Sequence, residues 1–193
     1  YPDATKVPGA IMWGGTTQGP GAVPGPYQVR LSYAGKTWTQ GFEIRKDLRV
    51  NITQEQMKEQ FDFLLRIRDK VSAAHEAVNT IREIRKQTDD LVKKLQKHPS
   101  KDSVTNSAKR LNDGLKQIEE EIIQVKIKSG QDALNYPIKL NDKIASISGV
   151  VASADTPPTK QSYDVFNELS GKLDGQLAKY KKILAEGLAR FNA

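Results

Sequence analysis

The inward-facing positions of residues 53–97 recur every three or four residues, which is the spacing of one face of a long α-helix. They are Met57, Phe61, Leu64, Ile67, Val71, Ala74, Val78, Ile81, Ile84, Thr88, Leu91 and Leu95. Thr53-Gln54-Glu55-Gln56 fits a capping box at the start of the helix, and Pro99 stops it. We therefore expect one nearly continuous helix over 53–97, a rod on the order of 65–70 Å long.

Three shorter helices are predicted after Pro99. The second begins within 100–103, the third begins near Pro137, and the fourth follows the loop at 153–158. Their inward positions are Val104, Ala108, Leu111, Leu115, Ile118, Ile122 and Val125, then Leu140, Ile144, Ile147 and Val151, and finally Tyr163, Phe166, Leu169, Leu173, Leu177, Tyr180, Leu184 and Leu188. Single apolar seams joined by short connections favour antiparallel neighbours. Residues 51–193 are therefore expected to form an elongated antiparallel four-helix bundle.

The pattern is different before residue 50, where Gly and Pro are frequent and apolar residues alternate with polar ones. Alternation over 27–33 and 37–44 predicts two strands, and Ala34-Gly35 offers a tight hairpin turn between them. A third short strand is expected around Ile11-Met12-Trp13. The sequence thus predicts an α+β protein, mainly α, with a β region at 1–50 and a helical region at 51–193.

The expected hairpin has one apolar face, and nothing within 1–50 can bury it. A sheet of two or three strands is a poor independent domain. Either the hairpin belongs to a partial β-sandwich whose other strands precede Tyr1, or it packs on the helices. In the first case the apolar face is a partner interface, formed with a separate polypeptide or with a second copy in a domain-swapped homodimer. The residues of this interface are Tyr27, Val29, Leu31, Trp38, Phe42 and Ile44.

Composition and charge exclude several classes of function. The chain has 193 residues and no Cys, so it can hold neither a disulfide scaffold nor a cysteine-based zinc or nucleophile site. The formal net charge of +7 is spread thinly along the chain and interleaved with acidic residues, which is typical of solvated helix surfaces rather than of nucleic-acid binding. No apolar run approaches the roughly 20 residues needed to span a bilayer.

The residues suggest no catalytic or metal-binding constellation. Neither His75 nor His98 has a Glu three residues before it, as a di-iron bundle would require. The glycine-rich segment at 14–19 lacks the Gly-Lys-Ser/Thr ending of a phosphate-binding loop. Because no nucleophile–base pair or converging carboxylates can be argued from the spacing, we assign no catalytic, cofactor-binding or metal-ligating residue.

Several motifs, taken in their order, resemble a known family. They are Tyr1-Pro2-Asp3-Ala4, Gly19-Pro20, Pro24-Gly25-Pro26-Tyr27-Gln28-Val29-Arg30-Leu31 and Phe42-Glu43-Ile44-Arg45-Lys46-Asp47, followed by Gln60-Phe61-Asp62, Arg66-Ile67-Arg68-Asp69, Asn135-Tyr136-Pro137-Ile138-Lys139-Leu140-Asn141 and Pro158-Thr159-Lys160-Gln161-Ser162-Tyr163. Over essentially its whole length, the chain resembles the end of the Ig-like domain and the helical region of bacterial BNR-repeat, sortilin-like β-propeller proteins. Such proteins are often labelled glycosyl hydrolase- or exo-sialidase-like.

The resemblance implies a partial Ig-like β-sandwich at the C-terminal end of a larger secreted or periplasmic protein. Any glycosidase-like activity would belong to the propeller, and no catalytic residue is carried onto this chain. We therefore expect a non-catalytic structural or interaction module. Its partner would be the N-terminal propeller and Ig-like part of the same protein, or a second protein chain. The alternative is a helical binding protein whose groove takes a peptide, lipid or glycan, and an enzyme is the least favoured class.

Overall fold

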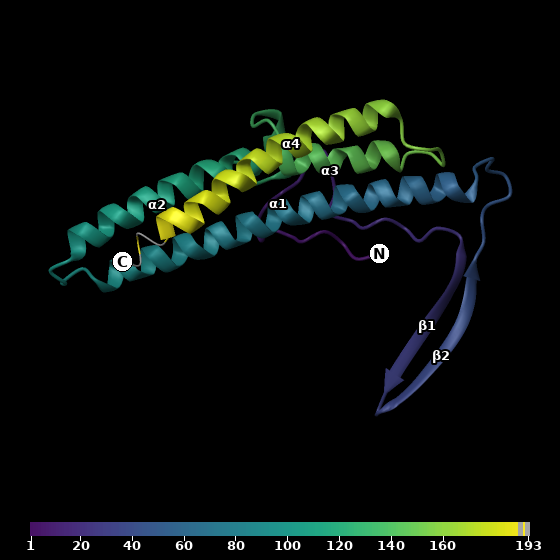
Figure 1. Ribbon diagram of the computed structural model, residues 1–193, viewed down its shortest axis with the longest axis horizontal. Coiled ribbons are helices and arrows are strands. Elements are labelled where there is room, and N and C mark those ends of the chain that lie inside the picture. Colours follow the sequence, from purple (N-terminus) through teal and green to yellow (C-terminus); the bar gives the residue numbers. More distant parts are fainter. Residues whose placement is uncertain (189–190, 192–193) are drawn as a thin grey trace.

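The structure is a computed structural model that describes residues 1–188 and 191. Figure 1 shows an elongated helical body and a long two-stranded hairpin that projects from one end of it. The elements are β1 (Gly25–Tyr33), β2 (Lys36–Ile44), α1 (Gln54–Lys94), α2 (Lys101–Ile122), the 3-10 helix η1 (Gly130–Leu134), α3 (Leu140–Val151), α4 (Lys160–Lys182) and the π-helical turn η2 (Ile183–Leu188). The protein is α+β and mainly helical, as the sequence predicts.

Helix α1 runs unbroken for 41 residues along the body. Its start is the predicted capping box: the Gln56 amide donates to the Thr53 hydroxyl, and the Thr53 amide donates to the Gln56 side chain. The helix ends at Lys94, and turns connect it to Pro99. The nearly continuous helix predicted over 53–97 is therefore confirmed, apart from its last residues.

The remaining helices do not stand side by side as four neighbours. Gln60 of α1 donates to the carbonyl of Val151 at the end of α3, whereas Thr88 of α1 donates to Asn112 in α2. Helices α2 and α3 therefore lie end to end along α1, antiparallel to it, and α4 packs along both (Figure 1). The irregular segment 123–139 interrupts this row without turning the chain back. As a result, three helices rather than four lie side by side along the body.

The core follows the inward face of α1. The sequence places Phe61 on the inward face, but the phenylalanine buried in the core is Phe63, two residues later. The Phe63 ring packs edge-to-face on Phe166 with centroids 5.3 Å apart. Phe61 is half-buried, and its ring centroid lies 4.7 Å from that of Tyr1. Leu91 was also expected to face inward but is 39% exposed. The buried residues of the other helices that complete the core include Leu115, Ile118, Ile122, Ile144, Ile147, Val151, Phe166 and Leu173.

Helix α4 closes the body and continues into the π-helical turn. The side chain of Leu188, which the sequence places inward, lies outside the described part of the structure. Within that described part, no helix combines the length and the apolar character needed to cross a membrane.

Residues 1–20, which we call the N-terminal segment, lie on the helical body rather than beside the strands. The segment runs along α1 and doubles back, with the Ala4 amide donating to the Thr17 carbonyl. Ala4 and Val7 are buried in the core. The strand expected around Ile11-Met12-Trp13 is wrong, since no strand forms there and the amides that follow bond to a helix side chain. Part of the region at 1–50 therefore packs on the helical body and contributes to its core.

The hairpin forms where the sequence predicts it. Strands β1 and β2 pair antiparallel, from Gly25 opposite Ile44 to Tyr33 opposite Lys36. Ala34 and Gly35 make the turn with φ of +48° and +76°. Two successive residues with positive φ define a type I′ turn, whose twist matches that of the strands. The hairpin is therefore a regular two-residue hairpin with a fixed register.

Candidate interaction surface

The register of the hairpin gathers its large apolar side chains on one face. Residues directly opposite each other in an antiparallel pair share a face, and successive residues alternate between faces. Tyr27 lies opposite Phe42, and Leu31 lies opposite Trp38. We call this the apolar face, and its apolar and aromatic residues are Tyr27, Val29, Leu31, Tyr33, Trp38, Phe42 and Ile44. The same face carries Gln40 opposite Val29 and Lys36 beside the turn. The other face is mainly polar and carries Gln28, Arg30, Ser32, Thr37, Thr39 and Glu43.

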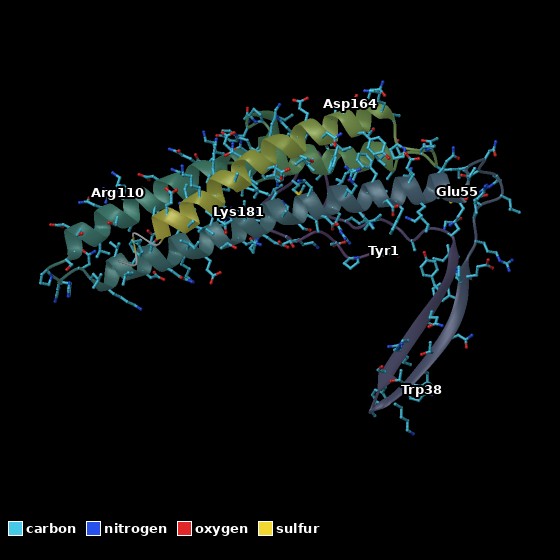
Figure 2. The ribbon with its side chains drawn as sticks, in the orientation of Figure 1. Tyr1, Trp38, Glu55, Arg110, Asp164 and Lys181 are labelled. Carbon is cyan, nitrogen blue, oxygen red and sulfur yellow. The ribbon has the colours of Figure 1, made fainter. Side chains whose placement is uncertain are left out.

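The apolar face is open to solvent. Leu31 is 63% exposed, Trp38 is 52% exposed and Phe42 is 49% exposed. Neither strand contacts a helix of the described chain, and the hairpin points away from the body (Figure 2). The side chain of Trp38 lies near the tip of the hairpin, far from the labelled side chains of the body. The second alternative left open by the sequence, a hairpin packed on its own helices, is therefore wrong for this chain.

The base of the hairpin is anchored, in contrast to its tip. The Tyr27 ring stacks on Phe42 with centroids 5.9 Å apart, and the Tyr27 hydroxyl donates to the Val23 carbonyl at 2.7 Å. The Gln54 side chain of α1 donates to the Pro24 carbonyl just before β1. All six predicted interface residues lie on the one face, and Tyr33, 75% exposed, adds a seventh side chain near the turn.

A second group of polar residues is buried in the body and holds the N-terminal segment. His75 of α1 is 1% exposed and bonds the Thr5 carbonyl through Nδ1 at 2.6 Å. Its Nε2 lies 3.0 Å from Nδ2 of Asn141 in α3. A carbonyl can only accept and an amide nitrogen can only donate, so His75 is the neutral Nδ1–H tautomer. Burial lowers the pKa of His75, and the Thr5 carbonyl and the charge of Asp142 offset this only in part.

Asp142, beside Asn141, holds residues 13–15 of the N-terminal segment where the segment doubles back. Its carboxylate accepts three consecutive backbone amides, those of Trp13 at 2.8 Å, Gly14 at 3.0 Å and Gly15 at 2.7 Å. Gly15 lies so close to α3 that a Cβ there would come within 2.6 Å of the backbone of that helix. The pair of glycines therefore allows the chain to lie against α3, and the carboxylate satisfies its amides.

Glu119 is a further buried carboxylate. It bonds Arg82 Nε at 2.7 Å and an Arg85 terminal nitrogen at 2.6 Å, and it joins α2 to α1. Arg82 also donates to the Pro8 carbonyl in the N-terminal segment. Nothing in the local pattern distinguishes Asp142 and Asn141 from solvated acidic or amide residues. The run Glu119-Glu120-Glu121 is most simply interpreted as a solvated face, which is wrong for Glu119 because it is only 4% exposed.

The buried polar groups described above are bonded to other groups of the protein. Both ring nitrogens of His75 are engaged, and the carboxylates of Asp142 and Glu119 accept hydrogen bonds from backbone amides and arginines of the protein itself. A proton shuttle needs access to a substrate and a free lone pair. Within residues 1–188 and 191, no group of three or more His, Cys, Asp or Glu is placed to hold a metal ion.

A shallow groove between α3 and α4 is the structural feature closest to a ligand site on the helices. Val150 is 66% exposed and Val165 is 47% exposed on its rim, and Ile147 lines it. Its volume of about 440 Å³ is in the range of small-molecule sites. On the hairpin, by comparison, Tyr33 and Trp38 are more than half exposed and Phe42 is 49% exposed. The hairpin is therefore the stronger candidate interaction surface.

The buried neutral His75 predicts a specific dependence of stability on pH. Its pKa is lower in the folded chain than in the unfolded chain, where it is about 6.5. Below about pH 6.5 the unfolded state binds more protons than the folded state. The free energy of unfolding therefore decreases as the pH is lowered, by up to about 1.4 kcal/mol per pH unit. Urea unfolding at pH 7.5, 6.5 and 5.5 measures this loss.

The matched control for this prediction is His75→Gln, which keeps an amide donor and acceptor but cannot titrate. The difference in stability between the two proteins isolates position 75, because the rest of the chain is identical in both. Wild type should lose more stability than His75→Gln between pH 6.5 and 5.5. Parallel pH profiles would show that His75 is not held neutral.

Comparisons of the chain with protein-family models, with curated proteins and with solved structures find no match.

Proposed function

We propose that this chain is a non-catalytic structural and interaction module, whose hairpin completes a β-sandwich formed with other strands of a larger protein. The observation that carries the proposal is the apolar face, a group of large exposed side chains on a regular hairpin that no helix of the described residues covers. Contiguous exposed apolar surface of this kind marks a protein interaction site. The resemblance to propeller-associated Ig-like domains supports strands of an Ig-like sandwich as the partner.

The free energies of hairpin formation and of apolar burial favour a hairpin whose apolar face is covered. A two-stranded hairpin is at best marginally stable by itself in water. Burial of roughly 500 Å² of apolar surface on this face would contribute on the order of 10 kcal/mol before the costs of association. Two free edges add unpaired backbone donors and acceptors. The helical body then acts as a rigid support at the base of the sandwich, joined to the hairpin through contacts such as that of Gln54 with Pro24.

The same proposal covers location and partner. By resemblance to the propeller proteins, the chain belongs to a secreted or periplasmic protein, and the hairpin meets the N-terminal propeller and Ig-like part. The coding sequence upstream of Tyr1 tests this directly: BNR repeats followed by strands support the proposal, and their absence contradicts it.

A pair of adjacent substitutions tests the role of the apolar face. Leu31→Lys places a charge on the apolar face, whereas Ser32→Lys places the same charge on the polar face one residue later. In the isolated chain, neither should change stability, because neither strand contacts a helix of the described residues. In the full polypeptide that the gene encodes, Leu31→Lys should lower the melting temperature by several degrees and Ser32→Lys should not. Equal effects of the two variants would contradict the proposal.

The proposal includes the absence of turnover by this chain alone. The buried carboxylates Asp142 and Glu119 are engaged with amides and arginines, and His75 is closed off. Purified chain should therefore hydrolyse neither sialosides nor aryl glycosides. Hydrolysis that is abolished by a point substitution within the chain would overturn this part of the proposal.

A further inference from the structure

We propose that the partner sheet pairs with the hairpin along β2, and that β1 is the outer edge of the completed sheet. This inference rests on the function proposed above and specifies which side of the hairpin the incoming strand occupies. It follows from which backbone groups of each strand point outward and from what surrounds them.

The turn determines which amides point outward. In a two-residue turn the residues on either side, Tyr33 and Lys36, exchange hydrogen bonds with each other. Hydrogen-bonded and non-hydrogen-bonded pairs alternate along an antiparallel ladder. The pairs Ser32–Thr37, Arg30–Thr39, Gln28–Gly41 and Pro26–Glu43 therefore direct their backbone groups away from the hairpin. These outward groups are what a third strand would bind.

The outer edge of β1 is protected in the ways that natural edge strands are. Pro26 occupies an outward position and has no amide hydrogen to offer a neighbour. Arg30 places a charge at the middle of the same edge, which discourages pairing. The backbone just before β1 already has hydrogen-bond partners, because the Val23 carbonyl accepts from Tyr27 and the Pro24 carbonyl accepts from Gln54.

The outer edge of β2 is unprotected. All four of its outward positions have an amide hydrogen, and the middle ones are uncharged: Thr37, Thr39 and Gly41, followed by Glu43 at the base. The side-chain contact with this edge is from Gln40 to the exposed Gly41 carbonyl at 3.2 Å, which water or another strand can replace. In the view of Figure 1, β2 also lies on the side of the hairpin away from the helical body.

The occupant that fits this edge is an extended strand from a sheet that also has a second layer. Its residues must alternate between apolar and polar so that its apolar side chains continue the face that carries Leu31 and Trp38. A second copy of this chain fits less well. Two copies paired through β2 would make one four-stranded sheet whose apolar face is twice as large and still uncovered.

Hydrogen exchange of the two strands tests the inference in the full polypeptide that the gene encodes. In the isolated chain, β1 and β2 should each protect only their inward amides. In the full polypeptide, the amides of Thr37, Thr39, Gly41 and Glu43 should gain protection, whereas those of Gln28, Arg30 and Ser32 should continue to exchange rapidly. Equal protection of both edges, or protection of β1 alone, would overturn the inference.

Two proline substitutions at directly opposed positions provide an independent test. Arg30 and Thr39 face each other in the register and both amides point outward, so proline at either position disturbs the hairpin to a similar degree. Thr39→Pro should raise the acrylamide quenching of Trp38 in the full polypeptide toward its value in the isolated chain. Arg30→Pro should leave quenching at the wild-type value. Circular dichroism at 222 nm confirms that the helical body folds in both variants.

The outcomes separate this inference from the function on which it rests. If Arg30→Pro exposes Trp38 and Thr39→Pro does not, β1 is the paired edge. The edge inference is then wrong, but the proposed function as an interaction module is retained. If neither variant exposes a Trp38 that is shielded in the full polypeptide, the partner covers the face without adding a strand, and the edge inference is wrong. If Trp38 is as accessible in the full polypeptide as in the isolated chain, the proposed function itself fails.

Discussion

A Val78→Asp variant is expected to lose at least about 3 kcal/mol of unfolding free energy. Val78 is completely buried, at the centre of α1 and among the core residues of the neighbouring helices. An aspartate there would either bury an unpaired charge or take up a proton to avoid doing so, and both are costly. Urea unfolding followed by circular dichroism at 222 nm measures the loss. Because α1 spans the body, the whole helical signal should shift in one transition.

Thr80→Asp is the matched control, two residues further along the same helix. Thr80 is exposed, so the same side chain at that position should change stability by no more than about 0.5 kcal/mol. A small effect at Val78 or an equally large one at Thr80 would mean that the inward face of α1 has been assigned incorrectly.

An Asp142→Ala variant should release residues 13–15 of the N-terminal segment from the helical body. Three backbone amides lose their acceptor at once, and in the variant all three would face the surface of α3 without a partner. Hydrogen bonds to a charged group contribute about 1.5–3 kcal/mol each, and the set is not additive, so the expected loss is about 3 kcal/mol. The amides of Trp13, Gly14 and Gly15 should exchange hydrogen much faster than in wild type.

Asp142→Asn separates the acceptor role from the shape of the side chain. It has the same size, but it retains one acceptor oxygen and replaces the other with an NH₂ donor. Its oxygen can still serve the two amides that now share Oδ1, those of Gly14 and Gly15, whereas the Trp13 amide would face a donor. An intermediate loss of protection, largest at Trp13, is therefore expected. No change at Trp13 in either variant would show that Asp142 does not hold the segment.

The elements that the sequence predicts correctly are those determined by local interactions. The Thr53–Gln56 capping box and the Pro99 stop lie within a few residues of the helix ends that they define. The hairpin follows from period-2 alternation around Ala34-Gly35, where the turn fixes the register. The same alternation identifies which residues share the apolar face, so the candidate surface could be found without a structure.

The N-terminal segment could not be predicted, because its partners are far away in sequence. Asp142 is 127 residues from the Gly15 amide that it accepts, and His75 is 70 residues from the Thr5 carbonyl. A chain rich in Gly and Pro with no regular pattern gives no local indication of the helix face on which it will lie. The apolar residues around Trp13 consequently predict a strand that the structure does not form.

The arrangement of α2 and α3 was missed for a related reason. Each has a single apolar seam, and a seam is consistent with either four helices side by side or three rows with one row interrupted. The same ambiguity places Phe61 on the inward face, when it instead contacts Tyr1 of the N-terminal segment. Burial along α1 therefore depends on a partner that the local pattern does not include.

The accessibility of Trp38 tests most directly whether the hairpin is an assembly surface. The chain has two tryptophans, so a Trp13→Phe background leaves Trp38 as the only tryptophan of the isolated chain. In the full polypeptide, the difference from a matched Trp38→Phe variant isolates the Trp38 signal. Acrylamide quenching and light scattering are then measured on the isolated chain and on the full polypeptide that the gene encodes. We predict an isolated chain in which Trp38 is readily quenched while the chain is monomeric, and a full polypeptide in which quenching falls several-fold. A monomeric isolated chain that already shields Trp38, or a full polypeptide that leaves it equally accessible, would contradict the role of the hairpin as an assembly surface.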